Sequence, residues 1–160
     1  MRIEKTRLTG WQNIVLVVLR FAVGWHLFYQ GFGKIVSVNW SSEGYLSASW
    51  GPFLKIAENP TLLSIADHAT MWGLVILGVC LMIGLFTRTA AVMGAGLLLM
   101  IYLAIPPLDY SGFVYSTNQG TELYVDKTLI EVLALIAVAS FDTGRILGLD
   151  ILVRNWRTHS

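Results

Sequence analysis

Three ionisable side chains lie inside long apolar stretches of the sequence. Arg20 and His26 stand in one stretch, and Glu131 stands in another near the C-terminus. Ionisable groups at membrane depth are energetically costly, so they mark candidate functional sites. A histidine titrates near neutral pH, a buried carboxyl group can hold a proton, and a guanidinium stabilises an anionic oxygen. Together these residue types suit proton-coupled chemistry inside a bilayer.

Helical spacing brings further polar residues towards these three. At about 1.5 Å per residue, His26 lies about 9 Å beyond Arg20 along a helix, near the expected level of Glu131. Lys127 stands one turn from Glu131 on the same helical face, and Gln30 stands one turn beyond His26. We therefore expect one polar pocket in the outer leaflet. Its expected members are Arg20, His26, Gln30, Lys34, His68, Lys127 and Glu131.

Each of these residues also has a purely structural interpretation. Arg20 and Glu131 would tie two helices together as an ion pair. His26 would be an interior histidine that is hydrogen-bonded across helices. His68 would cap a helix or lie at the interface, and the lysines at the rim would be snorkelling anchors. The residue pattern alone leaves these alternatives open.

The elements that must position these residues are membrane helices. Of the 160 residues, 55% are hydrophobic and only 13% are charged, and the mean hydropathy is +0.63. Soluble domains carry about 25% charged residues, so lipid is the expected solvent for most of the surface. A spanning helix needs roughly 20 apolar residues, and four runs meet or approach that length. These runs cover residues 12–32, 69–86, 89–105 and 124–141.

The positive residues predict the orientation of the four spans. The side that holds both termini carries seven lysines and arginines, and the opposite side carries three. Because positive loops stay in the cytoplasm, both termini are predicted to be cytoplasmic. The fold prediction is therefore an all-α membrane protein, a four-transmembrane-helix bundle that forms a single domain over residues 1–160. A long first extracytoplasmic loop covers residues 33–68, with an interfacial helix over 52–66, and a tight turn over 87–89 joins the second and third spans.

Several classes of function find no support. The net charge is +1 with no clustered basic face, so no nucleic-acid partner is expected. Cys80 is the one cysteine, which excludes an internal disulfide and a CxxC redox pair. No metal-ligand spacing, phosphate loop or dinucleotide fingerprint occurs, so no metal is expected. Haem b would need His26 and His68 as axial ligands, and two histidines in a bundle are too weak a signal to predict it.

Three stretches of the sequence, taken in their order along the chain, form a combined motif. Residues 19–34 follow the pattern LR-x3-G-x3-F-x2-G-x2-K, residues 78–88 read GVCLMIGLFTR, and residues 127–131 read KTLIE and are followed later by Leu149-Asp150. Jointly they resemble the DoxX/DoxD family of small four-span bacterial membrane proteins. The long first loop is similar to the DoxD-like branch of that family.

The resemblance implies a function that composition and spacing do not. DoxD is associated with a membrane thiosulfate:quinone oxidoreductase, and DoxX relatives with membrane oxidoreductase assemblies. The resemblance therefore implies that quinone is the cofactor. It also implies that membrane lipid and further oxidoreductase subunits are the partners, and that the protein lies in the bacterial cytoplasmic (inner) membrane. In that interpretation His26 and Glu131 act catalytically by moving protons. The residues that bind the cofactor are Arg20, His26, Gln30, Lys34, His68 and Lys127.

Three hypotheses follow for the function. The first is a membrane subunit of a quinone-linked oxidoreductase, which binds quinone or passes electrons and protons in the outer-leaflet pocket. The second is a non-catalytic scaffold or accessory subunit of a larger membrane complex. The third is a small transporter, although the inner halves of the last three spans are almost wholly apolar and offer no continuous polar route.

Overall fold

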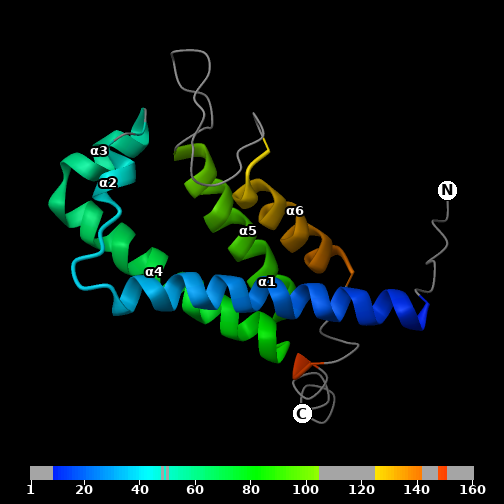
Figure 1. The fold of residues 1–160 in the computed structure, drawn as a ribbon. Coiled ribbons are helices and arrows are strands. Elements are labelled where there is room, and N and C mark those ends of the chain that lie inside the picture. Colours follow the sequence, from blue (N-terminus) through cyan, green and yellow to red (C-terminus); the bar gives the residue numbers. More distant parts are fainter. Residues whose placement is uncertain (1–8, 48, 50, 105–124, 142–147, 151–160) are drawn as a thin grey trace, which may run out of the picture.

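The computed structural model describes residues 9–47, 49, 51–104, 125–141 and 148–150, and every element in these ranges is a helix (Figure 1). The helices are α1 (Gly10–Val36), α2 (Glu43–Leu46), α3 (Pro52–Glu58), α4 (Pro60–Ile83), α5 (Thr87–Ala104) and α6 (Lys127–Ser140). The all-helical prediction is thus confirmed for this part of the chain. Within it, α1, α4 and α5 are long and apolar enough to cross a membrane. Helix α6 has 14 residues, about 21 Å of rise, so a fourth span stays a prediction.

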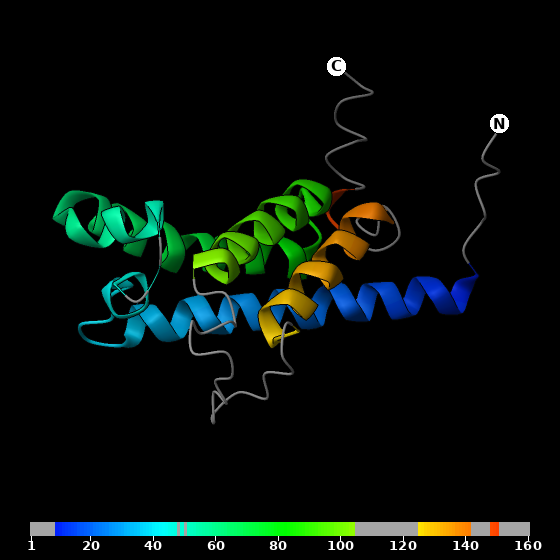
Figure 2. The ribbon, with the colours of Figure 1, turned by 90° about the horizontal axis from the view of Figure 1, so that it is seen from above.

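The long helices pack in two pairs, α1 with α4 and α5 with α6 (Figures 1 and 2). Glycines allow α1 and α4 to approach closely. A Cβ atom on Gly78 of α4 would lie 2.7 Å from the carbonyl oxygen of Gly24 and 2.5 Å from the backbone nitrogen of Phe28 on α1. Smaller contacts of α4 with α5, and of α1 with α6, join the two pairs. Such close packing at small residues is typical of helix association in membranes.

Apolar side chains fill the inside of this arrangement and also cover its outside. Leu27, Leu74, Leu81 and Leu135 are buried and bring α1, α4 and α6 into one core, to which α5 adds alanines and Leu98. The outward faces of the long helices carry many exposed large apolar residues. A surface of this kind is stable against lipid, so the helices are placed to contact membrane lipid.

Two helix boundaries differ from the sequence prediction. The predicted interfacial helix over 52–66 is divided at Asn59, where α3 has ended and α4 begins, nine residues before the predicted start of the second span. The Asn59 side chain accepts hydrogen bonds from the N–H groups of Thr61 and Leu62, and Pro60 occupies the first turn, a favourable helix start.

The turn between α4 and α5 also lies earlier than predicted, at residues 84–86 instead of 87–89. Gly84 adopts a left-handed conformation with φ of 70°, and its N–H bonds to the carbonyls of Cys80 and Leu81. This is a common way for a helix to end, because glycine has no Cβ to clash in that conformation. Thr87 and Arg88, expected in the turn, therefore belong to the first turn of α5.

Candidate functional site

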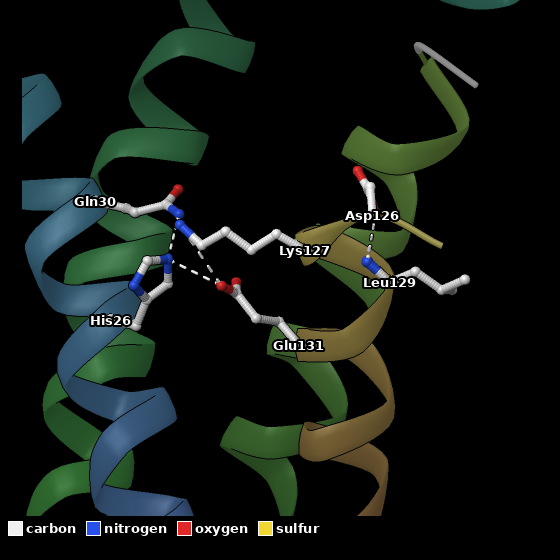
Figure 3. A network of polar contacts seen from close by, with 6 residues as sticks. All are labelled: His26, Gln30, Asp126, Lys127, Leu129 and Glu131. Carbon is white, nitrogen blue, oxygen red and sulfur yellow. Dashed lines mark hydrogen bonds and ion pairs between the residues drawn. The ribbon is translucent and has the colours of Figure 1, made fainter. Parts of the chain in front are cut away.

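Four polar side chains, one pair from α1 and one pair from α6, meet between these two helices (Figure 3). His26 Nε2 lies 2.9 Å from Glu131 Oε1, and Lys127 Nζ lies 4.0 Å from the same oxygen. Gln30 Nε2 lies 2.5 Å from His26 Nε2. We call His26, Gln30, Lys127 and Glu131 the α1–α6 polar cluster. It joins two helices that are otherwise in little contact.

Local helix geometry explains how the cluster forms. His26 and Gln30 are four residues apart on α1, and Lys127 and Glu131 are four apart on α6, so each pair lies on one face. The Asp126 carboxylate accepts a hydrogen bond of 2.8 Å from the N–H of Leu129 and so fixes the start of α6. This cap puts Lys127 in the first turn and Glu131 one turn deeper, opposite His26.

The cluster is partly open. The exposed fraction of the side chain is 31% for His26, 13% for Glu131 and 52% for Lys127. One imidazole nitrogen faces both an amide group and a carboxyl group, so it can accept or donate a proton according to the tautomer of the ring. The arrangement is therefore suited to hold a proton between histidine and carboxyl and to offer amide and ammonium donors to a ligand.

Arg20 does not join this cluster, although the sequence led us to expect it there. Its guanidinium lies against the α4–α5 turn, where a Cβ atom on Gly84 would be 3.2 Å from the Arg20 guanidinium carbon. Its side chain is buried, with an exposed fraction of 3%. The Asp150 carboxylate is close enough for its charge to act on it. Arg20 therefore does not pair with Glu131 as expected. It lies instead beside the α4–α5 turn, at the other end of the bundle from the cluster.

The surroundings of Arg20 form a junction of three segments. Asp150 accepts hydrogen bonds from the N–H groups of Phe86 (2.6 Å), the last residue of the turn, and Thr87 (3.1 Å), the first residue of α5. The N–H of Asp150 bonds in turn to the carbonyl of Gly84 at 3.0 Å. Helix α1 continues beyond this junction for ten residues, Gly10 to Leu19, and extends past the other helices (Figures 1 and 2). Arg20 therefore lies level with the turn between α4 and α5.

The two remaining predicted residues lie outside the cluster. Lys34 is in the last turn of α1, and its Nζ lies 5.1 Å from the ring centroid of Trp40. His68 is exposed on α4, and its Nδ1 lies 2.8 Å from the carbonyl oxygen of Ser64 in the same helix. Within the described ranges, no group of three His, Cys, Asp or Glu side chains is arranged to hold a metal ion.

A second polar network, which the sequence analysis did not predict, fixes the short helix α2 against α4. Asp67 of α4 accepts hydrogen bonds from Ser41 Oγ (2.9 Å), the Ser42 N–H (2.7 Å) and the Ser42 hydroxyl. Ser42 is fully buried. A serine directly before an acidic residue, as in Ser42-Glu43, is a helix-start signal that would have indicated α2. Its partner Asp67 is 25 residues away and carries no local signal.

Tyr45 belongs to this network and gives it a pH dependence. Burial raises the pKa of Tyr45, the nearby Asp67 charge adds to this, and hydrogen bonds with Thr70 and Ser42 oppose it. The folded protein thus holds the phenolic proton above the unfolded pKa of roughly 10, where the unfolded chain loses it. The stability that Tyr45 contributes is complete below that pH and is lost as the pH rises towards the folded-state pKa.

Tyr45→Phe is therefore expected to lose less stability than the unaltered protein between pH 9 and pH 11. Thermal unfolding in detergent, followed by circular dichroism at both pH values, measures this difference. Tyr29→Phe, which changes an exposed tyrosine on α1, is the control and is expected to follow the unaltered protein. Equal alkaline losses for all three proteins would remove Tyr45 from the explanation.

Comparison with known proteins adds one finding. A family model described as DoxX matches residues 15–106, which is more than half of the chain. The match covers α1 from residue 15 onward and all of α2 to α5, and it includes Arg20, His26, Gln30, Lys34 and His68. Searches of curated proteins and of solved structures give no match to this chain.

Proposed function

The chain belongs to the DoxX family of membrane proteins, and from this premise we propose that it is an integral membrane subunit of a quinone-linked oxidoreductase. The α1–α6 polar cluster is the proposed site for the quinone headgroup. In this arrangement both termini are cytoplasmic, α6 is the fourth span, and the cluster lies towards the outer leaflet of a bacterial cytoplasmic membrane. The DoxD-like branch stays a prediction.

The observation that carries the proposal is the contact between His26 Nε2 and Glu131 Oε1, which are 2.9 Å apart. Both side chains are partly exposed, and the other exposed residues of α1 and α6 are mostly apolar. Polar groups are costly at membrane depth and are expected where a ligand or a proton uses them. A purely structural pair would be expected to be fully enclosed, whereas His26 is 31% exposed.

The residues present fit a quinone headgroup. The headgroup is a flat ring with two carbonyl oxygens, which need hydrogen-bond donors at bilayer depth. The Gln30 amide and the Lys127 ammonium are such donors. Trp25 and Tyr29, both more than half exposed, neighbour His26 and Gln30 on α1 and offer aromatic and apolar surface for the ring and its tail. Arg20 and His68 are not part of the proposed set, because they lie away from the cluster.

The roles of the protein groups follow from this fit. A bound quinone supplies two-electron, two-proton redox chemistry. Gln30 and Lys127 orient the carbonyl oxygens. His26 and Glu131 hold a proton between Nε2 and Oε1 and can pass it to an oxygen that lies within hydrogen-bond reach.

Quinone binding is tested with Glu131→Gln and His26→Phe in the purified full chain. Quinone that copurifies is extracted and quantified, and a short-chain ubiquinone is titrated while tryptophan fluorescence is followed. Loss of one hydrogen bond costs about 1.4 kcal/mol, so each variant is expected to bind about tenfold more weakly. Glu58→Gln, an exposed glutamate on α3, is the matched control. Absence of copurified quinone, together with equal titrations for all variants, would refute the proposal.

The accessory-subunit hypothesis remains the second candidate, because the same contact ties α1 to α6 and would serve structure alone. In that case Glu131→Gln leaves the quinone titration unchanged but lowers the unfolding temperature or releases partner subunits from the isolated complex. No contact among the described residues adds support to the transporter hypothesis.

A further inference from the structure

Gln30 and Glu131 both contact the same ring nitrogen of His26. Gln30 Nε2 lies 2.5 Å from His26 Nε2, and Glu131 Oε1 lies 2.9 Å from it. An imidazole nitrogen carries either a proton, which it donates, or a lone pair, which accepts a hydrogen bond. The position of one proton therefore decides which end of the Gln30 amide can face the ring.

Two arrangements of the three side chains follow from this rule. In the first, His26 Nε2 has no proton and accepts an N–H of the Gln30 amide, while the proton of the pair is on Glu131. In the second, the proton has moved from Glu131 Oε1 to His26 Nε2, and the ring N–H points at the carboxylate. The amide nitrogen is itself a donor, so the amide then turns to place its oxygen on the ring N–H. The proton that leaves Oε1 is the one that Nε2 gains, so the net charge of the pair does not change.

The structure has the first arrangement. The amide nitrogen of Gln30 faces His26, and the amide oxygen points away from the ring (Figure 3). The Gln30 side chain is only partly buried, so the outward end of the amide is open to a ligand. That end is the carbonyl oxygen, an acceptor, in the first arrangement and the NH2 group, a donor, in the second.

The two redox forms of a quinone differ in the same property. The oxidised headgroup has carbonyl oxygens, which only accept hydrogen bonds, whereas the reduced headgroup has hydroxyl groups, which donate them. A site that is built to pair with one form discriminates against the other, because a buried donor or acceptor is then left unpaired. The first arrangement therefore suits a hydroquinone and the second suits a quinone.

We propose that Gln30 is a specificity-determining residue of the α1–α6 polar cluster, because its amide couples the proton on His26 to the redox form of the ligand. The cluster selects hydroquinone when Nε2 has no proton and quinone when Nε2 is protonated. This inference rests on the proposed quinone function and adds to it the choice between the two redox forms. Falling pH adds protons to the cluster, so it shifts the preference towards quinone, and rising pH shifts it towards hydroquinone.

The groups that surround the ring limit where this pH dependence can arise. Among the described residues, Glu131 and Lys127 approach His26 from α6, and the charge of Lys34 acts on it from α1 itself. Helix α4 meets α1 at Gly78 and at apolar side chains. A lysine ordinarily titrates at about pH 10, above the range of the test below. The dependence is therefore expected from the pair of His26 and Glu131.

The test measures how the purified full chain binds a short-chain ubiquinone and the same molecule in its reduced form under argon. Isothermal titration calorimetry is done at about pH 6 and about pH 8, the range in which histidine titrates. The ratio of the two dissociation constants is expected to change about tenfold between these pH values, the effect of one hydrogen bond. In Gln30→Met, which has no amide, the ratio is expected to stay the same. Gln12→Met, an exposed glutamine at the other end of α1, is the matched control and is expected to behave like the unaltered protein.

A second measurement needs no ligand. Nitrogen-15 NMR of the histidine-labelled protein shows which ring nitrogen of His26 carries the proton. At about pH 8, Nε2 is expected to be unprotonated in the unaltered protein, and Gln30→Met is expected to move the proton towards Nε2.

The outcomes that contradict the proposal are separable from failure of the proposed function. A ratio that does not change with pH, or a change that Gln30→Met retains in full, overturns the role of Gln30 and leaves quinone binding in place. A proton on Nε2 at about pH 8 in the ligand-free protein also overturns it, because the amide nitrogen cannot then face the ring. If neither redox form binds, the proposed function fails, and the role of Gln30 fails with it.

Discussion

Asp150→Ala is expected to lower the free energy of unfolding by about 3 kcal/mol, a large fraction of the stability of a small domain. The Asp150 carboxylate accepts hydrogen bonds from the N–H groups of Phe86 and Thr87, so the substitution removes the acceptor at the start of α5. It also removes the negative charge that acts on the buried Arg20 guanidinium. Loss of a helix cap costs about 1 kcal/mol, and removal of a negative charge that stabilises a buried guanidinium adds to that cost.

Three further variants, Asp150→Asn, Arg20→Met and the combination of both, separate the cap from the charge. Asp150→Asn keeps an oxygen that accepts an N–H but loses the charge, so it is expected to lose part of the stability only. In the double variant Arg20→Met with Asp150→Asn both of these charges are absent, and it is expected to be more stable than the sum of the two single losses predicts. Unfolding in mixed detergent, followed by circular dichroism, gives the four values. If Asp150→Ala unfolds like the unaltered protein, the junction does not stabilise the bundle.

The long helices were predictable because their sequences are apolar over the length of a membrane. The predicted runs for α1, α4 and α5 overlap the observed helices, and only their ends differ. The predicted helix ends differ from the observed ones where short local signals set the boundary. Asn59-Pro60 starts α4 within the expected loop, and Gly84 ends it before the expected turn.

The candidate site was predictable only in part, because the sequence does not show how far one helix is shifted along its neighbour. Spacing along one helix gives the level of a residue in that helix, and it correctly placed His26 and Glu131 near each other. It does not give the level of one helix relative to another. The close contact of α1 with α4 at Gly24 and Gly78 sets that register, and it puts Arg20 beside the turn after α4.

The proximity of the Asp150 charge to Arg20 could not be predicted at all. Asp150 is 130 residues away in sequence and lies beyond the last apolar run, in a segment with no helical periodicity to place it. The roles of the predicted site residues in binding and catalysis stay predictions. What the structure adds is which of them meet: His26, Gln30, Lys127 and Glu131 do so, and Arg20 does not.

Gly78→Ala is expected to destabilise the protein by about 3 kcal/mol, although alanine is the better helix former. The added Cβ atom would lie 2.5 Å from the nitrogen and 2.8 Å from the Cα of Phe28, and 2.7 Å from the carbonyl oxygen of Gly24. All three atoms belong to the α1 backbone, which cannot turn aside as a side chain can. The two helices must therefore separate, and the contacts between them weaken along their length.

The matched control is Gly96→Ala on α5, where no heavy atom lies within 4 Å of the added Cβ atom. Only the helix propensity changes there, so this variant is expected to be unchanged or more stable by up to about 1 kcal/mol. The same unfolding measurement compares the two. Equal stabilities would mean that α1 and α4 are not in close backbone contact. Because that contact sets the level of α1, Gly78→Ala is also expected to disturb the α1–α6 polar cluster and to weaken the quinone binding proposed there, whereas Gly96→Ala is expected to leave both intact.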